Sequence, residues 1–237
     1  MKLLNECVLT DKCSYLKDKE QTAHYKILSE CSTEYCTTLV QRGWRRFGKM
    51  FFRPICADCH ECQSIKIDVI NYNFSKSERR IIKKNSGMKS IIQTPTVSHE
   101  HINLFNKYHD YMHENKKWDN NQTDIKSYYT SFVSGHDNFG YEILYYDDNK
   151  LIGVDLIDII EDGISSIYFY YDPEYRHLSL GKYSLYRQIN LAKVLKKPWI
   201  YLGYYVKDCP SLSYKNQFSP YMILQNRPTD LEEDIWN

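Results

Sequence analysis

The sequence lacks any apolar run that approaches the roughly 20 residues needed to span a bilayer. Its first segment, MKLLNECVLTDKC, also lacks the apolar core of a secretory signal peptide. Both absences favour a cytoplasmic protein and predict no membrane partner. The formal net charge of the 237 residues is only +1, so a nucleic-acid partner would have to be bound by a local basic patch. No internal repeat or low-complexity tract is present.

Cysteine, by contrast, is abundant, with eight residues of which seven precede residue 63. Without a secretory signal, this number predicts thiol chemistry, metal binding or plain burial, and not a disulfide framework. Two residues separate Cys56 from Cys59 and Cys59 from Cys62, a spacing that lets thiolates face one centre in zinc and iron–sulfur sites. Cys13 or His60 would supply a fourth ligand. The alternative is a set of reduced, packed thiols.

A pair of short strands is expected over residues 43–48 and 50–54, where arginines lie beside aromatic residues. Such a surface can stack on bases and contact phosphates, so Arg45 and Arg46 are predicted to bind nucleic acid or substrate. Stacking of arginine on aromatic rings inside the fold would give the same pattern.

A basic helix is expected from residue 76 to about residue 86. It opens with a capping box formed by Ser75 and Glu78, and Gly87 closes it. Four cations share one face of this helix at i, i+4 spacing, with no acid between them. We therefore expect a contact with phosphate, against the alternative of a solvated face. The four residues are Arg79, Arg80, Lys83 and Lys84.

Residues 163–205 are expected to form a strand, a short loop, a helix and a second strand. The first strand is rich in β-branched and aromatic residues, and Pro173 ends it. A loop that ends in glycine before a helix exposes unpaired N–H groups, which makes it a site for phosphate. Arg176, Ser179 and Gly181 are therefore predicted to bind phosphate, with Arg176 as a bidentate donor.

Strands are also expected at 140–146, 151–160 and around 221–224, and helices at 100–114 and 125–133. His109 and His113 lack the glutamate of a zinc-protease helix, so both are expected on an exposed face. The class is α+β. A smaller cysteine-containing N-terminal α+β domain (residues 1–95) is expected to precede a domain with an antiparallel or mixed sheet and flanking helices (residues 96–237).

The order of strands, loop, helix and strand in the second domain resembles the GNAT acyltransferase fold. In that fold the loop holds the pyrophosphate of acyl-CoA, and its usual signature has two glycines. Here Arg176 is followed by only one glycine, Gly181. The resemblance implies acyl transfer in a GNAT-like domain and leaves coenzyme A as the less favoured donor.

A more specific resemblance covers nearly the whole chain. The N-terminal segments that carry it are Cys13-Ser-Tyr-Leu16, Gly43-Trp-Arg-Arg46, Phe52-Arg-Pro-Ile-Cys56 and Ser75-Lys-Ser-Glu-Arg-Arg80. The C-terminal ones include Asp162-Gly-Ile-Ser165, Tyr171-Asp-Pro173, Ser179-Leu-Gly181 and Tyr201-Leu-Gly-Tyr204. In this order they resemble the aminoacyl-tRNA–protein transferases. That family moves an amino acid from charged tRNA to the N-terminus of a protein and so marks the protein for degradation.

The short length and the closely spaced cysteines resemble the bacterial branch of that family, which transfers leucine to N-terminal Asp or Glu. The resemblance therefore implies leucyl-tRNA and proteins with an acidic N-terminus as partners. A zinc ion or an iron–sulfur cluster at Cys13, Cys56, Cys59 and Cys62 is a hypothesis, because residues 13–16 keep only one cysteine where the arginine-transferring branch has a pair.

The expected chemistry needs no cofactor, because an aminoacyl ester is already activated and an α-amine has a pKa of about 7.7–8.0. Positioning and stabilisation of the oxyanion would supply most of the rate. Asp158 and Tyr168, on neighbouring strands, are predicted to handle the proton. The residues expected to bind phosphate or the acidic side chain of the substrate are Lys207, Tyr214 and Lys215.

Three alternatives stay open from the sequence. One is arginyl transfer from arginyl-tRNA, and the second is an acetyl-CoA-dependent N-acetyltransferase of the GNAT type. The third is a non-catalytic RNA-binding module in which the cysteines hold a structural zinc ion.

Overall fold

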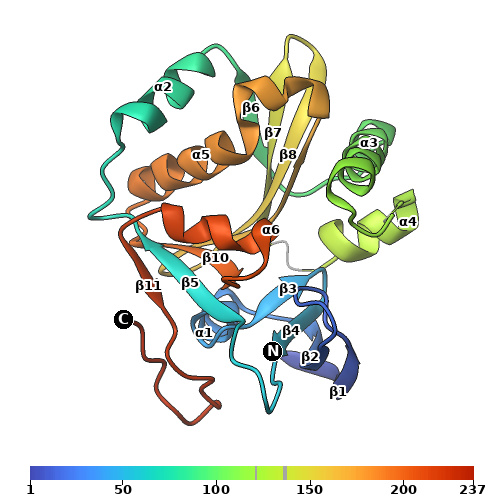
Figure 1. Ribbon diagram of the computed structural model, residues 1–237, viewed down its shortest axis with the longest axis vertical. Coiled ribbons are helices and arrows are strands. Elements are labelled where there is room, and N and C mark those ends of the chain that lie inside the picture. Colours follow the sequence, from blue (N-terminus) through green and yellow to red (C-terminus); the bar gives the residue numbers. More distant parts are fainter. Residues whose placement is uncertain (121, 136–137) are drawn as a thin grey trace.

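The structure is a computed structural model that describes residues 1–120, 122–135 and 138–237. Two sheets organise the chain (Figure 1). The smaller one contains, in spatial order, β1 (Lys2–Lys12), β2 (Glu20–Glu30), β4 (Met50–Pro54) and β3 (Arg45–Phe47). The larger, seven-stranded one contains, in spatial order, β11 (Tyr221–Ile223), β5 (Gln63–Asp68), β10 (Trp199–Tyr205), β9 (Gly163–Tyr171), β8 (Lys150–Ile159), β7 (Gly140–Asp147) and β6 (Lys89–Gln93).

One neighbouring pair in the large sheet is parallel, and this pair is formed by β9 and β10. The crossover between them consists of a 3₁₀ helix (Pro173–Leu178) and α5 (Leu180–Val194). The strand, helix and strand predicted for residues 163–205 are thus confirmed. The loop was predicted wrongly, because α5 already begins at Leu180 and Gly181 lies in its first turn.

Helices cover both faces of the large sheet. On one face lie α5 and α2 (Lys76–Lys84), over a core that includes Ile143 of β7. On the other face lie α3 (His99–Lys116) and α4 (Ile125–Tyr128), and α4 continues as one π-helical turn. These elements share a core with Leu144 of β7. Adjacent residues of β7 point to opposite faces because strand side chains alternate. The mixed sheet with flanking helices is therefore confirmed.

The small sheet and α1 (Thr33–Gln41) pack against the large sheet through a core of their own. Leu28, Trp44 and Phe51 meet Ile160 and Tyr201 there. The large sheet also takes β5 and β6 from within residues 1–95, so its core spans the expected domain boundary. In the described part of the chain, no helix has both the length and the apolar character that a bilayer crossing demands.

Candidate active site

The candidate active site is the place where β9 and β10 part. Their parallel pairing covers only Trp199–Tyr201 against residues 163–165, although both strands run on. Gly203 of β10 has a φ of +80°, and a Cβ there would come within 2.7 Å of Arg45 Nε. Glycine is therefore needed for its backbone conformation and for the close approach of an arginine. We call the opening between β9 and β10, together with the side chains of Arg45 and Lys215 that reach it, the splay.

Arg45 of β3 enters the splay from the small sheet. Its Nη1 donates to Ser165 Oγ at 3.1 Å, and its Nη2 donates to the carbonyl of Ser166. Burial lowers the pKa of this guanidinium, as expected for a cation removed from water. Arg45 is half-buried and places a positive charge between the two sheets, one of the two arrangements that its sequence pattern allowed.

Lys215 reaches the splay from the segment after β10, where α6 (Pro210–Ser213) leads into a 3₁₀ turn (Tyr214–Gln217). Its Nζ donates to the carbonyls of Leu202 and Tyr204, both at 2.8 Å. Burial, and then the nearby charge of Arg45, lower its pKa to about 7. Such a lysine can exchange a proton at neutral pH.

The two residues predicted beside Lys215 lie in different surroundings. Lys207 is exposed in the loop after β10. Tyr214 has an exposed ring edge, but burial and then the charge of Asp155 raise the pKa of its hydroxyl. Of the three residues predicted to bind substrate there, Lys215 is the one that donates hydrogen bonds to carbonyls of β10.

An acid that the sequence reasoning missed lies on β8 under α5. Gln188 Nε2 donates to Asp155 Oδ1 and Oδ2 at 3.0 and 2.9 Å, and it lies 3.2 Å from Ser166 Oγ. Asp155 is fully buried, and burial raises its pKa to about 7. The sequence does show Asp155 as an acid inside the apolar run Leu151–Ile157. Asp158 follows the same run three residues later, so the pattern alone does not tell which of the two acids has the perturbed environment.

Asp158, predicted to handle the proton, is also fully buried. Arg46 Nε donates to its Oδ2 at 2.7 Å, and Arg46 Nη2 donates to its Oδ1. Burial disfavours the charge of Arg46, but Asp158 outweighs this and raises the pKa of the guanidinium. The guanidinium of Arg46 and the carboxylate of Asp158 use their hydrogen-bonding groups on each other. This geometry argues against the predicted roles of Asp158 in proton transfer and of Arg46 in RNA binding.

Tyr168 contacts α3 through its hydroxyl. Its hydroxyl lies 2.9 Å from His109 Nε2, and His109 Nδ1 lies 2.9 Å from the carbonyl of Phe105. The expectation of two exposed histidines was therefore wrong for His109, which is 3% exposed, whereas His113 is exposed. The structure does not bring the predicted catalytic pair, Asp158 and Tyr168, together.

The turn before α5 is anchored by an acid, and its Arg176 Nη1 donates to the carbonyl of Pro173 at 3.4 Å. Asp172 accepts hydrogen bonds from Lys107 Nζ and Lys150 Nζ, both at 2.8 Å. Arg176, Ser179 and Gly181 are exposed, and Ser179 makes no side-chain cap to the N–H groups of α5. The first turn of a 15-residue helix is thus open to an anion beside an exposed arginine.

The basic helix α2 lies directly beside this turn. Lys84 Nζ donates to the carbonyl of His177 at 2.7 Å, and Asn85 Nδ2 donates to that of Leu178 at 3.0 Å. The capping box of Ser75 and Glu78 is confirmed. Its four predicted cations, Arg79, Arg80, Lys83 and Lys84, are all exposed. The structure therefore joins the two predicted phosphate-binding segments into one surface.

The four predicted metal ligands lie near one another without a ligating arrangement. Burial, and then the neighbouring Cys13, Cys56 and Cys59, raise the pKa of Cys62 to about 12. Cys56 Sγ instead accepts from the backbone N–H of Thr22 at 3.3 Å. Within residues 1–120, 122–135 and 138–237, no three His, Cys, Asp or Glu side chains are placed to hold a metal ion. The thiols as placed do not fit zinc or a cluster, and that site stays a prediction.

Two family models match the chain. Residues 11–80 match the model of the arginine-tRNA-protein transferase N terminus, and residues 100–225 match that of its C terminus. The chain belongs to the arginine-tRNA-protein transferase family, and it is an enzyme of the aminoacyl-tRNA–protein transferase class. The family resemblance found in the sequence is thereby confirmed.

Individual relatives are similar over almost their whole length. An aspartate/glutamate leucyltransferase of Campylobacter jejuni subsp. jejuni serotype O:6 is 51% identical over 229 residues, which cover 97% of this chain and 96% of the relative. One of Helicobacter hepaticus is 39% identical over 94% of this chain and 93% of its own. Among solved structures, FemX shares 10% identity at a TM-score of 0.46 over 84% of this chain and 62% of its own, too weak a likeness to assign a fold.

Proposed function

We propose that this chain transfers leucine from leucyl-tRNA to the α-amine of proteins that begin with Asp or Glu, which marks them for degradation. The observation that carries this proposal is the 51% identity, over 97% of the chain, to a protein called aspartate/glutamate leucyltransferase. The splay supports it, because it gives the reaction a place with charges of the required kind.

The division of labour follows from where the cations lie. The exposed cations of α2 and Arg176, next to the open first turn of α5, would hold phosphates of the tRNA acceptor end. The leucyl ester would then enter the splay. This layout corresponds to a GNAT-like arrangement, and the parting of one parallel strand pair above a helix N-terminus supports that assignment.

In the splay, the amine nitrogen attacks the carbonyl carbon of the ester. A C–N bond forms, the C–O bond to the terminal ribose breaks, and the proton lost by the amine ends on the ribose hydroxyl. Arg45 would stabilise the negative charge that develops on the carbonyl oxygen. Neutral Lys215, with its pKa of about 7, would accept the proton of the amine and pass it on.

Incubation of the purified protein with radiolabelled leucyl-tRNA or arginyl-tRNA tests this function. Peptides that begin with Asp, Glu, Lys or Arg serve as acceptors. We expect label only from leucyl-tRNA and only on the Asp and Glu peptides. Transfer of arginine, acetylation from acetyl-CoA without transfer from tRNA, or tRNA binding without any transfer would each contradict the proposal.

A further inference from the structure

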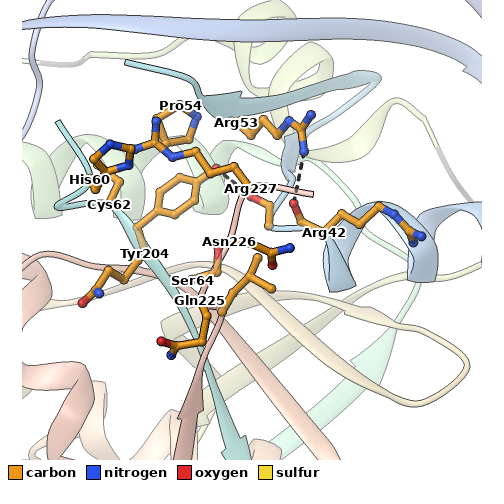
Figure 2. A pocket seen from close by; sticks show the side chains of 13 residues that line it. Arg42, Arg53, Pro54, His60, Cys62, Ser64, Tyr204, Gln225, Asn226 and Arg227 are labelled. Carbon is orange, nitrogen blue, oxygen red and sulfur yellow. Dashed lines mark hydrogen bonds between the residues drawn. The ribbon is translucent and has the colours of Figure 1, made fainter. Parts of the chain in front are cut away.

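A pocket of about 300 Å³ (Figure 2) lies on the side of β10 that faces the small sheet, and the residues that line it do not belong to α2 or to the turn before α5. Its walls come from β4, β5 and β10 and from the C-terminal segment, residues 224–227. Arg53 and Arg227 bring two guanidinium groups to it, and Arg42 lies beside them. Neither Asp nor Glu is among the residues that line it.

The arginines of this pocket are held by carbonyls and not by carboxylates. Arg53 Nη1 donates to the carbonyl of Pro228 at 2.7 Å, and Arg227 Nη1 and Nη2 donate to those of Cys56 and Cys59 at 2.8 and 2.6 Å. In the described part of the chain, no carboxylate forms an ion pair with Arg42, Arg53 or Arg227. Their charges are positioned but not neutralised.

Arg53 has a further unused donor. Its Nε is buried and has no hydrogen-bond partner among the described residues, while its guanidinium lies 4.8 Å from the ring centre of Trp44. Burial lowers its pKa, and Arg227 and Arg42 act in the same direction, although Asp230 and Tyr204 act against them. A bound anion would relieve this cost, since an opposite charge offsets the desolvation of a buried cation.

Tyr204 connects this pocket to the splay. Its side chain lines the pocket, and its hydroxyl donates to the carbonyl of Gly43 at 3.0 Å. Its own carbonyl accepts the 2.8 Å hydrogen bond from Lys215 Nζ. The pocket and the splay therefore lie on two sides of the same residue of β10. Because neighbouring strands of a sheet lie only about 4.8 Å apart, the two sites are close to each other. An acidic side chain in the pocket would leave its α-amine close to the splay.

We propose that this pocket receives the carboxylate of the N-terminal Asp or Glu of the acceptor protein, with Arg53 as the residue that determines specificity. The inference rests on the proposed function and gives the acidic side chain a different site from Lys207, Tyr214 and Lys215. A carboxylate is favoured over tRNA phosphate as the ligand of this pocket, because the cations proposed to bind phosphate, those of α2 and Arg176, lie on the α5 side of the sheet. The neutral amides of Gln63, Gln225 and Asn226 around the pocket suit peptide groups.

Steady-state kinetics on peptides that begin with Asp or Asn test the proposal. We expect Arg53→Gln to raise KM for the Asp peptide about 10- to 100-fold, because the variant loses the hydrogen bond between the guanidinium and the carboxylate of the peptide. KM for leucyl-tRNA should not change, and the preference for Asp over Asn should narrow. Arg53→Lys should keep part of the preference. Arg187→Gln, which removes a half-buried arginine outside both sites, is the matched control and should behave as wild type.

Two results would overturn the assignment. One is an unchanged preference for Asp in Arg53→Gln, and the other is a rise in KM for leucyl-tRNA instead of the peptide, which would make the pocket a tRNA site. Both differ from failure of the proposed function, in which the wild-type protein itself transfers no leucine to either acidic peptide.

A second measurement uses the wild-type protein, because Arg53 also holds the C-terminal segment and its variants could misfold. Arginines are labelled with phenylglyoxal and mapped by mass spectrometry. The Asp peptide should protect Arg53 and leave Arg79 of α2 open, whereas tRNA should do the opposite. Equal labelling of Arg53 with and without the Asp peptide would contradict the proposal.

Discussion

Asp155 and Asp158 lie three residues apart on β8, both fully buried, and their different partners separate their chemistry. Asp158 faces the guanidinium of Arg46, whereas Asp155 faces the neutral amide of Gln188. Burial raises the pKa of Asp155 from 3.8 to about 7. The sequence shows two equivalent acids, since Arg46 is 112 positions away from Asp158.

Asp155→Asn is expected to stabilise the fold at pH 8 and to lose this advantage toward pH 4. Between pH 3.8 and about 7, folded Asp155 holds a proton that the unfolded chain lacks, so wild-type stability falls as pH rises. The difference in free energy of unfolding should grow by about 2–4 kcal/mol over this range. Urea unfolding at both pH values measures it. Asp119→Asn, at an exposed position, is the control. If the difference in unfolding free energy between Asp155→Asn and wild type does not vary with pH, the raised pKa of Asp155 is refuted.

Lys215→Arg is expected to lower kcat by about 100-fold or more, because arginine stays charged and accepts no proton. Wild-type kcat/KM should rise steeply up to about pH 7, where Lys215 loses its proton, and less steeply up to about pH 8, where the α-amine of the acceptor loses its own. The variant should keep only the shallower rise due to the amine. Its KM for leucyl-tRNA should stay unchanged. Wild-type rates with the same steep profile in the variant would exclude Lys215 as the proton acceptor.

At the scale of elements, local signals were sufficient to predict most helices and strands. The capping box at Ser75 and the proline at 173 indicated where α2 begins and where β9 ends. The splay was beyond such reasoning. It depends on Gly203 accepting the side chain of Arg45 from another sheet, and on Lys215 returning to the carbonyls of β10. Side-chain contacts between distant segments leave no periodic pattern in a sequence.

The same limit explains the misplaced candidates. Tyr168 bonds to His109, 59 positions away, and Arg46 turns inward because Asp158 is there to receive it. The pocket at Arg53 was not foreseen, since its arginines come from residues 42, 53 and 227 and meet only in the fold. The exposed basic face of α2 was predictable because it needs no partner within the chain.

Helix α2 supplies the prediction at this scale. Arg79, Arg80 and Lys83 form no ion pair or side-chain hydrogen bond in the described part of the chain, so their change to Gln should not disturb the fold. Affinity for tRNA should fall about tenfold or more, and the slope of log affinity against log salt should flatten by roughly two units. Fluorescence anisotropy over a salt series measures both.

The matched control for α2 removes the same charge elsewhere. Lys49, Lys116 and Lys126 are exposed and lie away from α2 and the turn before α5. Their combined change to Gln should alter tRNA affinity much less. Equal losses in both triple variants would mean that overall charge, and not the α2 surface, governs tRNA binding.

At the scale of the whole molecule, our proposals assign the two substrates to different sides of β10. In the proposed arrangement, the tRNA end approaches from α2 and α5, the acceptor approaches from the small sheet, and the reacting groups meet where β9 and β10 part. The near-neutral net charge of +1 suits this arrangement, because attraction for tRNA is confined to one surface.

The most direct measurement of the central claim is the identity of the product. A peptide that begins with Asp and also contains an internal lysine is incubated with leucyl-tRNA and the protein, and the product is sequenced by tandem mass spectrometry. We predict a single added leucine, joined by a peptide bond to the α-amine of the Asp. An unmodified peptide, or leucine on the lysine side chain, would contradict it.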